Sequence, residues 1–525
     1  MKKKVNLILV SQSSAKKNIL KTLAEGFNNN YDVLCLSSHM YLEFEEAQIL
    51  AESSKSIIFK NFSDYLNEKE MVFCDEQADK DILLSYKSRK GKINEYYNRI
   101  KYIKNQVLYK NVTSEFELQE SYILSSDLGI CKDIWLENNL STRFLDEPKN
   151  SKYIKLASSL RKFTGFFITS INQSVSTFEC EDGSHVFFGH TSRLNKYFKK
   201  HVSFKKLNYV DAFFIKTSLM ILLTSKKIPV LKYFLYKFIG IFKSRFKSQY
   251  LSFDSSIHEY SDNFGDLAKL FNIDMHVYQD GLLPGNYSSK YLLYYQYVDS
   301  FLVWDDISSK ILKKNNQNVK KSNVYQKDFI DNIHAIKKVK KILYIASGSG
   351  DWTAVKTRTD EDKAFDIFMK SALQRQDIKF IFRPHPLWEH AKHQGLGSIK
   401  RLMDYADKYG PKNLHVSRQA YRDSKESINS SVMAVKSNSL QSAIEQADII
   451  IGDHSESLLD SLRQGKIVAS LNTSKRESLF QDFIDLGFPL LSSSCDILNF
   501  IDLCEQQNFV SSFNKSINIY NNKSL

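Results

Sequence analysis

Several features that would assign this chain of 525 residues to a simple class are missing from its sequence. Its six cysteines are scattered, and no pair has the spacing of a metal site or of a redox motif. No apolar stretch reaches the roughly 20 residues that a membrane-spanning helix needs. Internal repeats and a recognisable nucleic-acid-reading module are also missing. We therefore expect a protein of a reducing compartment that does not bind nucleic acid and keeps its cysteines as small buried hydrophobic residues.

The bulk composition is that of a folded protein with an excess of positive charge. Aromatic residues make up 13% of the chain, which argues against wholesale disorder. A chain this long exceeds a single core, so two or three domains are expected. The formal net charge of +14 favours anionic partners such as nucleotides, acidic glycans or phospholipid surfaces.

The N-terminal segment predicts a parallel sheet. Residues 4–10 have the pattern of a buried strand, 14–28 that of a helix and 31–36 that of a second strand. The apolar run of the first strand is short and leads into Ser11 without a cleavage site, so a strand is favoured over a signal peptide. We expect a cytoplasmic protein.

Strand and helix patterns alternate again in the second half, which is the signature of a doubly wound domain. The predicted fold class is therefore α/β, with two Rossmann-like domains. Residues 1–308 form the N-terminal, acceptor-side domain, 309–327 a linker rich in Lys and Asn, 328–505 the C-terminal domain and 506–525 a weakly packed tail.

Polar residues follow two predicted strands of the C-terminal domain. The strand at 378–383 runs into Pro384-His385-Pro386, and the strand at 448–452 runs into the polar stretch 453–457. In an open α/β sheet, ligands bind beyond the carboxyl ends of the strands. The prolines also restrict the backbone of Arg383 and His385. These two segments therefore predict a binding site.

An ordered set of short motifs resembles a known family. Gln279-Asp280-Gly281, His385-Pro386 and Ser455-Glu456-Ser457 follow one another as in bacterial sialyltransferases and related transferases of CMP-activated nonulosonate or Kdo sugars. The last two motifs also resemble those of CDP-glycerol glycerophosphotransferases. The resemblance implies the two-domain GT-B architecture, in which a nucleotide-sugar donor and an acceptor bind in the cleft between two Rossmann-like domains.

The resemblance assigns roles that the chemistry supports. Asp280 is the expected base for the acceptor hydroxyl, and His385 is the expected donor to the departing phosphate. His454 is expected in the wall of the nucleotide pocket. The remaining donor-binding candidates are Ser347, Gly348, Ser349, Gly350, Arg383, Pro386, Asp453, Ser455, Glu456 and Ser457.

The set departs from the family pattern at two positions. Gln279 replaces an acidic residue, and Glu456 replaces a small hydroxyl residue. Glu181-Asp182-Gly183 is a rival match to the acidic motif, but its position between two alternating stretches is typical of a tight hairpin turn. No Asp-x-Asp motif stands at a cleft position, so we expect no metal ion and no cofactor besides the CMP-sugar as co-substrate.

A basic, aromatic segment occupies residues 212–253, which contain no Asp or Glu and eight Lys or Arg. Such composition is typical of inserted amphipathic helices that bind a membrane surface. A pair of core helices whose lysines reach outward fits equally well. Both interpretations stay open, and the first would hold the protein at the inner face of the cell membrane.

We expect a glycosyltransferase of bacterial capsule synthesis that moves an acidic sugar from its CMP form to a glycan acceptor with inversion. A lipid-linked acceptor would suit the membrane-surface interpretation. A CDP-polyol phosphotransferase of a teichoic-type polymer is the alternative within transferases. A non-catalytic scaffold that binds anionic polymer at the membrane is the alternative of another class.

Overall fold

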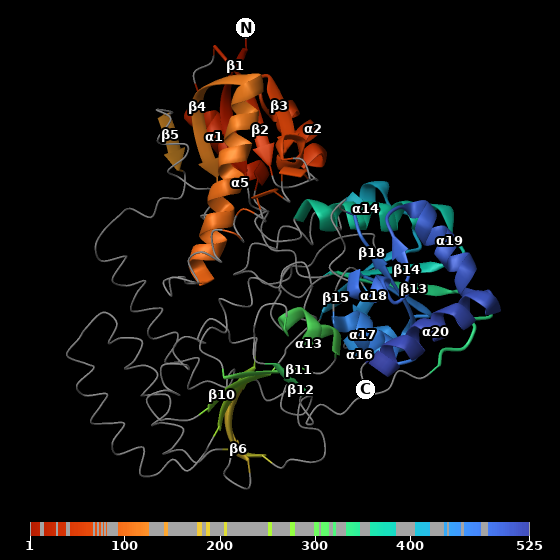
Figure 1. Cartoon of the computed structure of the whole chain (residues 1–525). Helices are drawn as coiled ribbons and strands as arrows, with labels where there is room; N and C mark the ends of the chain where they lie inside the picture. Colours follow the sequence, from red (N-terminus) through yellow and green to blue (C-terminus); the bar gives the residue numbers. More distant parts are fainter. Residues whose placement is uncertain are drawn as a thin grey trace, which may run out of the picture. The chain divides into compact units, whose positions relative to one another are not determined.

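The structure is a computed structural model of the whole chain (Figure 1). Two compact units make up the chain: residues 1–82, 94–147 and 330–519 form one, and 83–93, 148–329 and 520–525 form the other. The described residues are 2–10, 15–27, 30–37, 42–66, 69–70, 73–74, 77, 80, 93–124, 141–144, 176–180, 185–189, 204–206, 250–254, 274–278, 299–303, 306–313, 319–321, 332–346, 358–384, 405–419, 435–437, 440–452, 456–473 and 481–523.

The N-terminal sheet has five parallel strands in the order β3-β2-β1-β4-β5. Its elements are β1 (Lys3–Val10), α1 (Ala15–Glu25), β2 (Asp32–Ser37), α2 (Leu42–Glu52), β3 (Ile57–Asn61), α3 (Phe62–Tyr65), α5 (Ile93–Glu115), β4 (Phe116–Leu124) and β5 (Ser141–Phe144). This strand order is that of a Rossmann-like sheet, because β2 and β3 are added on one side of β1 and β4 and β5 on the other.

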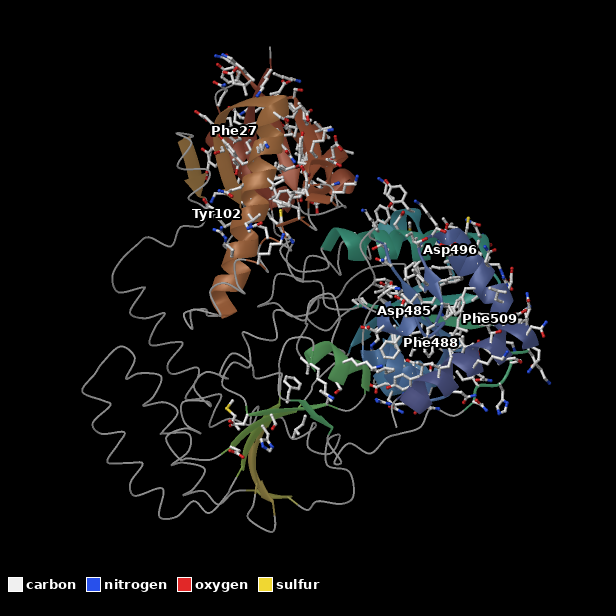
Figure 2. The ribbon with its side chains drawn as sticks, in the orientation of Figure 1. Phe27, Tyr102, Asp485, Phe488, Asp496 and Phe509 are labelled. Carbon is white, nitrogen blue, oxygen red and sulfur yellow. The ribbon has the colours of Figure 1, made fainter. Side chains whose placement is uncertain are left out.

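Both faces of the N-terminal sheet are buried, which explains the continuous apolar run of β1. Leu7 and Leu9 pack with Leu108 of α5 on one face. Ile8 packs with Ile19 of α1 on the other face. Phe27, which is labelled in Figure 2, lies just beyond α1. Its ring meets that of Tyr122 edge-on, with the ring centroids 4.7 Å apart.

A second sheet of seven strands belongs to the middle of the chain and has the order β12-β11-β10-β9-β7-β6-β8. Its strands are β6 (Ser176–Cys180), β7 (His185–Gly189), β8 (Phe204–Lys206), β9 (Tyr250–Asp254), β10 (Asp274–Tyr278), β11 (Ser300–Val303) and β12 (Val319–Lys321). The neighbouring strands β7, β9, β10, β11 and β12 pair in parallel. Strand β6 pairs antiparallel with β7 and β8. The antiparallel pairing of β6 with β7 agrees with the predicted hairpin, whose predicted turn at 181–183 lies outside the described residues.

The C-terminal sheet has seven parallel strands in the order β16-β15-β14-β13-β17-β18-β19. Its strands are β13 (Lys341–Ile345), β14 (Lys379–Arg383), β15 (Leu414–Gln419), β16 (Val435–Ser437), β17 (Ile449–Gly452), β18 (Ile467–Leu471) and β19 (Leu490–Leu491). Its helices are α14 (Arg358–Gln374), α16 (Leu440–Gln446), α17 (Glu456–Arg463), α18 (Gln481–Ile484), α19 (Ser494–Cys504) and α20 (Gln507–Lys523). The parallel sheets and their helices confirm the predicted α/β class.

Aromatic side chains fill one face of the C-terminal sheet. Tyr344 stacks on Phe382 with ring centroids 4.9 Å apart, and Phe368 of α14 meets Phe380 edge-on at 5.1 Å. These contacts fix α14 over β13 and β14, so that the strand ends are held by a rigid core.

Two boundary segments differ from the sequence-based expectation. Helix α20 occupies the predicted tail, because Val510, Phe513 and Ile517 recur at helical spacing and are all buried. The predicted linker contains the end of α13 (Asp306–Lys313) and the short edge strand β12, which pairs with β11. The predicted domain 1–308 therefore holds the N-terminal sheet and most of a separate middle sheet, and the cleft between two domains stays a prediction.

Within the described part of the chain, no helix combines the length and the apolar character needed to cross a membrane. Most of the basic segment 212–253 lies outside the described residues. Its last residues differ from the predicted helix, because Tyr250–Asp254 forms strand β9 between β7 and β10.

Candidate functional site

The carboxyl ends of three neighbouring strands of the C-terminal sheet lie level with one another. Ile345, the last residue of β13, is in register with Arg383 at the end of β14 and with Gly452 at the end of β17. The chain proceeds from β13 toward β16 on one side and then crosses to β17 on the other. The ends of β13 and β17 therefore flank the switch point, where ligands bind in open α/β sheets.

Gly452 allows the chain to turn tightly between β17 and α17. A Cβ atom at this position would come within 3.0 Å of the Ile345 carbonyl oxygen and 3.2 Å of Leu458 Cδ2. Glycine is thus required by close packing on both sides. Because Leu458 belongs to α17, this helix covers the face of the sheet toward which position 452 points.

Arg383 places a positive charge at this edge of the sheet. Side chains at paired positions of neighbouring parallel strands point to the same face of the sheet. Arg383 is in register with Ile345, and Ile345 with Gly452, so the Arg383 side chain lies on the face that α17 covers. It is only 4% exposed, and its carbonyl oxygen accepts from the Ala346 N–H at 3.0 Å. A buried guanidinium at a strand end is suited to bind an anionic group that enters the edge.

Most of the predicted donor-binding residues lie outside the described residues. Two of them open α17: Glu456 is its first residue, and Ser457 accepts at its carbonyl oxygen from Ser461 Oγ at 2.6 Å. Of the predicted site residues, the structure describes these two and Arg383. Arg383 ends β14, and the other two begin α17, the helix that follows β17. The predicted residues outside the described part are Ser347, Gly348, Ser349, Gly350, His385, Pro386, Asp453, His454 and Ser455.

The predicted base is also outside the described part, but its strand is placed. In the sequence, Asp280 follows Tyr278, the last residue of β10 in the middle sheet, by two positions. Tyr278 is in register with Asp254, the last residue of β9. The next strand along, β11, leads into α13, which begins at Asp306.

Sequence reasoning did not single out Asp254 or Asp306. The sequence pattern that would have identified them is present, because each acid follows a short apolar run, as Asp280 does. Only the strand order shows that β9, β10 and β11 are neighbours. Asp182, the rival base, stands between β6 and β7 in the sequence and is outside the described residues.

None of the described cysteines forms a disulfide. Cys35, Cys74 and Cys504 are buried as expected, whereas Cys495 is exposed. Burial raises the pKa of the Cys35 and Cys504 thiols far above the ordinary value, so both stay protonated. Among the described residues, no group of His, Cys, Asp and Glu is arranged to hold a metal ion.

No protein-family model matches this sequence, and no curated protein matches it. Among solved structures, it resembles a UDP-GlcNAc 2-epimerase from Neisseria meningitidis bound to UDP-GlcNAc, at 10% identity and a TM-score of 0.31, over 77% of this chain and 90% of that one. It also resembles the HepE protein of Anabaena in complex with UDP and glucose, at 8% identity and a TM-score of 0.35, over 57% of this chain and 79% of that one.

A third similar structure is the glycosyltransferase SnogD from Streptomyces nogalater, at 10% identity and a TM-score of 0.30, over 77% of this chain and 88% of that one. Identities and TM-scores at this level do not assign a donor, an acceptor or an activity to this chain.

Proposed function

We propose that this protein is a glycosyltransferase of bacterial surface polysaccharide synthesis that uses a CMP-activated acidic sugar and inverts the anomeric carbon. One observation carries the proposal. Three candidate segments that are far apart in sequence, 347–350, 385–386 and 453–457, follow strand ends that lie side by side at the switch point. A nucleotide that occupied this edge would meet all three.

The proposed chemistry is a single displacement at carbon. The acceptor hydroxyl gives its proton to Asp280 as its oxygen bonds to the anomeric carbon, and the bond from that carbon to the phosphate oxygen breaks. CMP leaves with one more negative charge. Protonated His385 and the guanidinium of Arg383 would stabilise this charge.

The start of α17 supplies a further means of binding the leaving phosphate. The first N–H groups of a helix lack partners within the helix and favour a negative charge. Ser455 and Ser457 would add hydroxyl donors there. No step in this scheme requires a metal ion, which is why we expect transfer to survive chelation.

A second transferase reaction uses the same motifs. In a CDP-polyol phosphotransferase, the acceptor oxygen would attack phosphorus and CMP would leave. The two reactions differ in their products, because only the first releases a free sugar when water replaces the acceptor. A non-catalytic scaffold would release neither product.

Donor hydrolysis tests the proposal most directly. The purified full chain would be incubated with CMP-sialic acid, CMP-Kdo, CDP-glycerol and UDP-GlcNAc, with and without EDTA, and released sugar and nucleotide would be measured. We expect free sugar and CMP from a CMP-sugar only, with no effect of EDTA. Turnover of UDP-GlcNAc alone would overturn the donor assignment, and glycerol phosphate from CDP-glycerol would favour the phosphotransferase.

Binding distinguishes a weak enzyme from a scaffold. Thermal unfolding would be measured with CMP, CDP, UDP and GDP, because a ligand that binds only the folded state raises the midpoint. We expect the largest rise with CMP. Arg383→Ala should remove most of this rise, and a missing rise with every nucleotide would support the scaffold.

A further inference from the structure

The amino edge of the C-terminal sheet, opposite the proposed donor site, has an unusual arrangement of lysines. Lys341 begins β13 and Lys379 begins β14, and the two are directly in register. Like charges at facing positions of neighbouring strands destabilise a sheet. Burial and the nearby Lys341 charge both lower the pKa of Lys379, as expected for two cations that lie close together.

The corresponding edge of the N-terminal sheet shows the contrasting arrangement. There, Lys3 of β1 forms an ion pair with Asp32 of β2 at 2.6 Å, and Lys4 pairs with Glu117 of β4 at 3.5 Å. Neighbouring strands thus match opposite charges in the N-terminal sheet and oppose like charges in the C-terminal sheet. Because facing lysines do not stabilise the sheet, this arrangement favours an anionic partner.

More lysines extend this edge on both sides of the Lys341–Lys379 pair. Lys337, Lys338 and Lys340 stand in the stretch that leads into β13, and Lys412 precedes β15; all four are exposed. We call the following set the lysine edge: Lys337, Lys338, Lys340, Lys341, Lys379 and Lys412.

The stretch before β13 is held in place by the fold. Ile333 and Val339 are buried. The Ile333 N–H donates to Asn514 Oδ1 at 2.8 Å, and Asn514 Nδ2 donates back to the Ile333 carbonyl oxygen at 2.9 Å. The Val339 N–H donates to Glu505 Oε1 at 2.7 Å. The exposed lysines are therefore presented by a fixed backbone rather than by a loose tail.

The described carboxylates near this edge serve the fold itself. Asp448 Oδ2 accepts from the backbone N–H groups of Lys340 and Lys341, each at 2.8 Å. Asp377 is bound by Arg375 at 3.0 Å and lies 3.9 Å from Lys338. Arg375 also binds Asp502 at 2.9 Å, and Lys466 interacts electrostatically with Asp448, Glu445 and Lys341. With Glu505, five carboxylates stand against the six lysines of the lysine edge together with Arg375 and Lys466, so the edge carries a net positive charge.

We propose that the lysine edge docks the protein on a membrane surface rich in anionic phospholipid. Lysine ammonium groups are point charges that suit a diffuse layer of phosphate headgroups better than one shaped anion. Each basic residue near such a surface contributes to binding, and the attraction acts only within a Debye length. This inference does not depend on the proposed transferase activity, because the edge lies opposite the donor site.

Vesicle co-sedimentation of the full chain tests the proposal. Wild type is expected to bind phosphatidylglycerol–phosphatidylcholine vesicles at low salt, to bind pure phosphatidylcholine much less, and to be released by salt. The triple variant Lys337→Glu, Lys340→Glu and Lys412→Glu should bind anionic vesicles about a hundredfold or more weakly. The milder triple variant K337Q, K340Q and K412Q should have an affinity for anionic vesicles between those of wild type and the Glu variant. This intermediate affinity would show that the loss in the Glu variant does not come from a folding defect.

A charge-matched control separates this edge from net charge. Lys17, Lys110 and Lys515 are also exposed, and their exchange for Glu changes the total charge by the same amount. We expect this variant to bind like wild type. Equal loss in the control, no binding by wild type, or equal binding to neutral vesicles would overturn the proposal. A second result would also overturn it. In that result, wild type binds a nucleic acid or polyphosphate but not vesicles, and the triple variant loses this binding.

Discussion

Gly452 and Ile345 meet at the switch point of the C-terminal sheet, where a Cβ on residue 452 would lie 3.0 Å from the Ile345 carbonyl oxygen. The two residues end adjacent strands, and the segments that follow them carry most of the predicted donor-binding residues. Their close approach leaves no room for a side chain at position 452. The packing of α17 and the shape of the proposed donor site therefore depend on one glycine.

Replacing Gly452 by valine should separate α17 from β17. We expect the free energy of unfolding to fall by about 1–3 kcal/mol, as for overpacking in a core. Nucleotide binding should weaken more than in a matched stability control, because the start of α17 moves with Leu458. Phe368→Leu, which disturbs the opposite face of the sheet, supplies that control. Thermal unfolding and nucleotide titration would measure both effects, and an unchanged affinity in Gly452→Val would contradict the role assigned to α17.

His385→Ala should leave the fold intact and lower turnover by about a hundredfold or more, as loss of a transition-state donor does. The expectation rests on its position two residues beyond the end of β14, between two prolines. Steady-state kinetics would measure turnover, and circular dichroism would check the fold. His334→Ala, at an exposed position, should behave as wild type. Near-normal turnover in folded His385→Ala would remove this residue from the mechanism.

Asp280→Asn should abolish transfer while nucleotide binding persists, because the change keeps the shape and removes the proton acceptor. Asp182→Asn, between β6 and β7 in the sequence, should have little effect. Asp254→Asn tests the acid that closes the neighbouring strand β9 and should reduce transfer less than Asp280→Asn. Transfer assays with parallel nucleotide titrations would rank the three variants by loss of activity. If Asp182→Asn is the inactive variant, the turn carries the base.

Asn413→Ala should destabilise the C-terminal sheet by about 1–3 kcal/mol, because carbonyl groups in and near the core lose their donor. Asn413 Nδ2 lies within hydrogen-bond distance of the carbonyl oxygens of Ala372 (3.1 Å), Arg375 (3.0 Å) and Ile378 (2.7 Å). These contacts fasten the end of α14 to the start of β14. Denaturant unfolding would measure the loss, and exposed Asn508→Ala should show none.

Exchanging Lys232, Lys237 and Lys243 for Glu tests the basic aromatic segment 212–253. If the segment binds a membrane surface, the variant should be released from anionic vesicles, while activity on a soluble acceptor persists. Each of these lysines would add about 1 kcal/mol of attraction to such a surface. Vesicle binding unchanged from wild type would favour the core-helix interpretation. Combining this variant with the lysine-edge variant shows whether the two surfaces contribute separately.

Local patterns predicted several of the described strands. The strand expected at 4–10 is Lys3–Val10, and the strand expected at 448–452 is Ile449–Gly452. Buried parallel strands have continuous apolar runs, and turn residues end them, so both can be recognised in sequence. The prediction of a weakly packed tail at 506–525 was wrong. The many Asn and Ser residues there made the segment look polar, although Val510, Phe513 and Ile517 form a buried stripe on α20.

The sequence by itself determined the α/β class and the polar segments at the strand ends, because both depend on short-range periodicity. The strand order was decided only by the tertiary structure. It brings the ends of β13, β14 and β17 together although 38 positions separate Ile345 from Arg383 and 69 separate Arg383 from Gly452. It also places β10, the strand that precedes Asp280 in the sequence, in a separate middle sheet, and it opposes Lys341 to Lys379. Strand pairing joins distant segments through backbone hydrogen bonds that every residue but proline can make, so no local pattern specifies it.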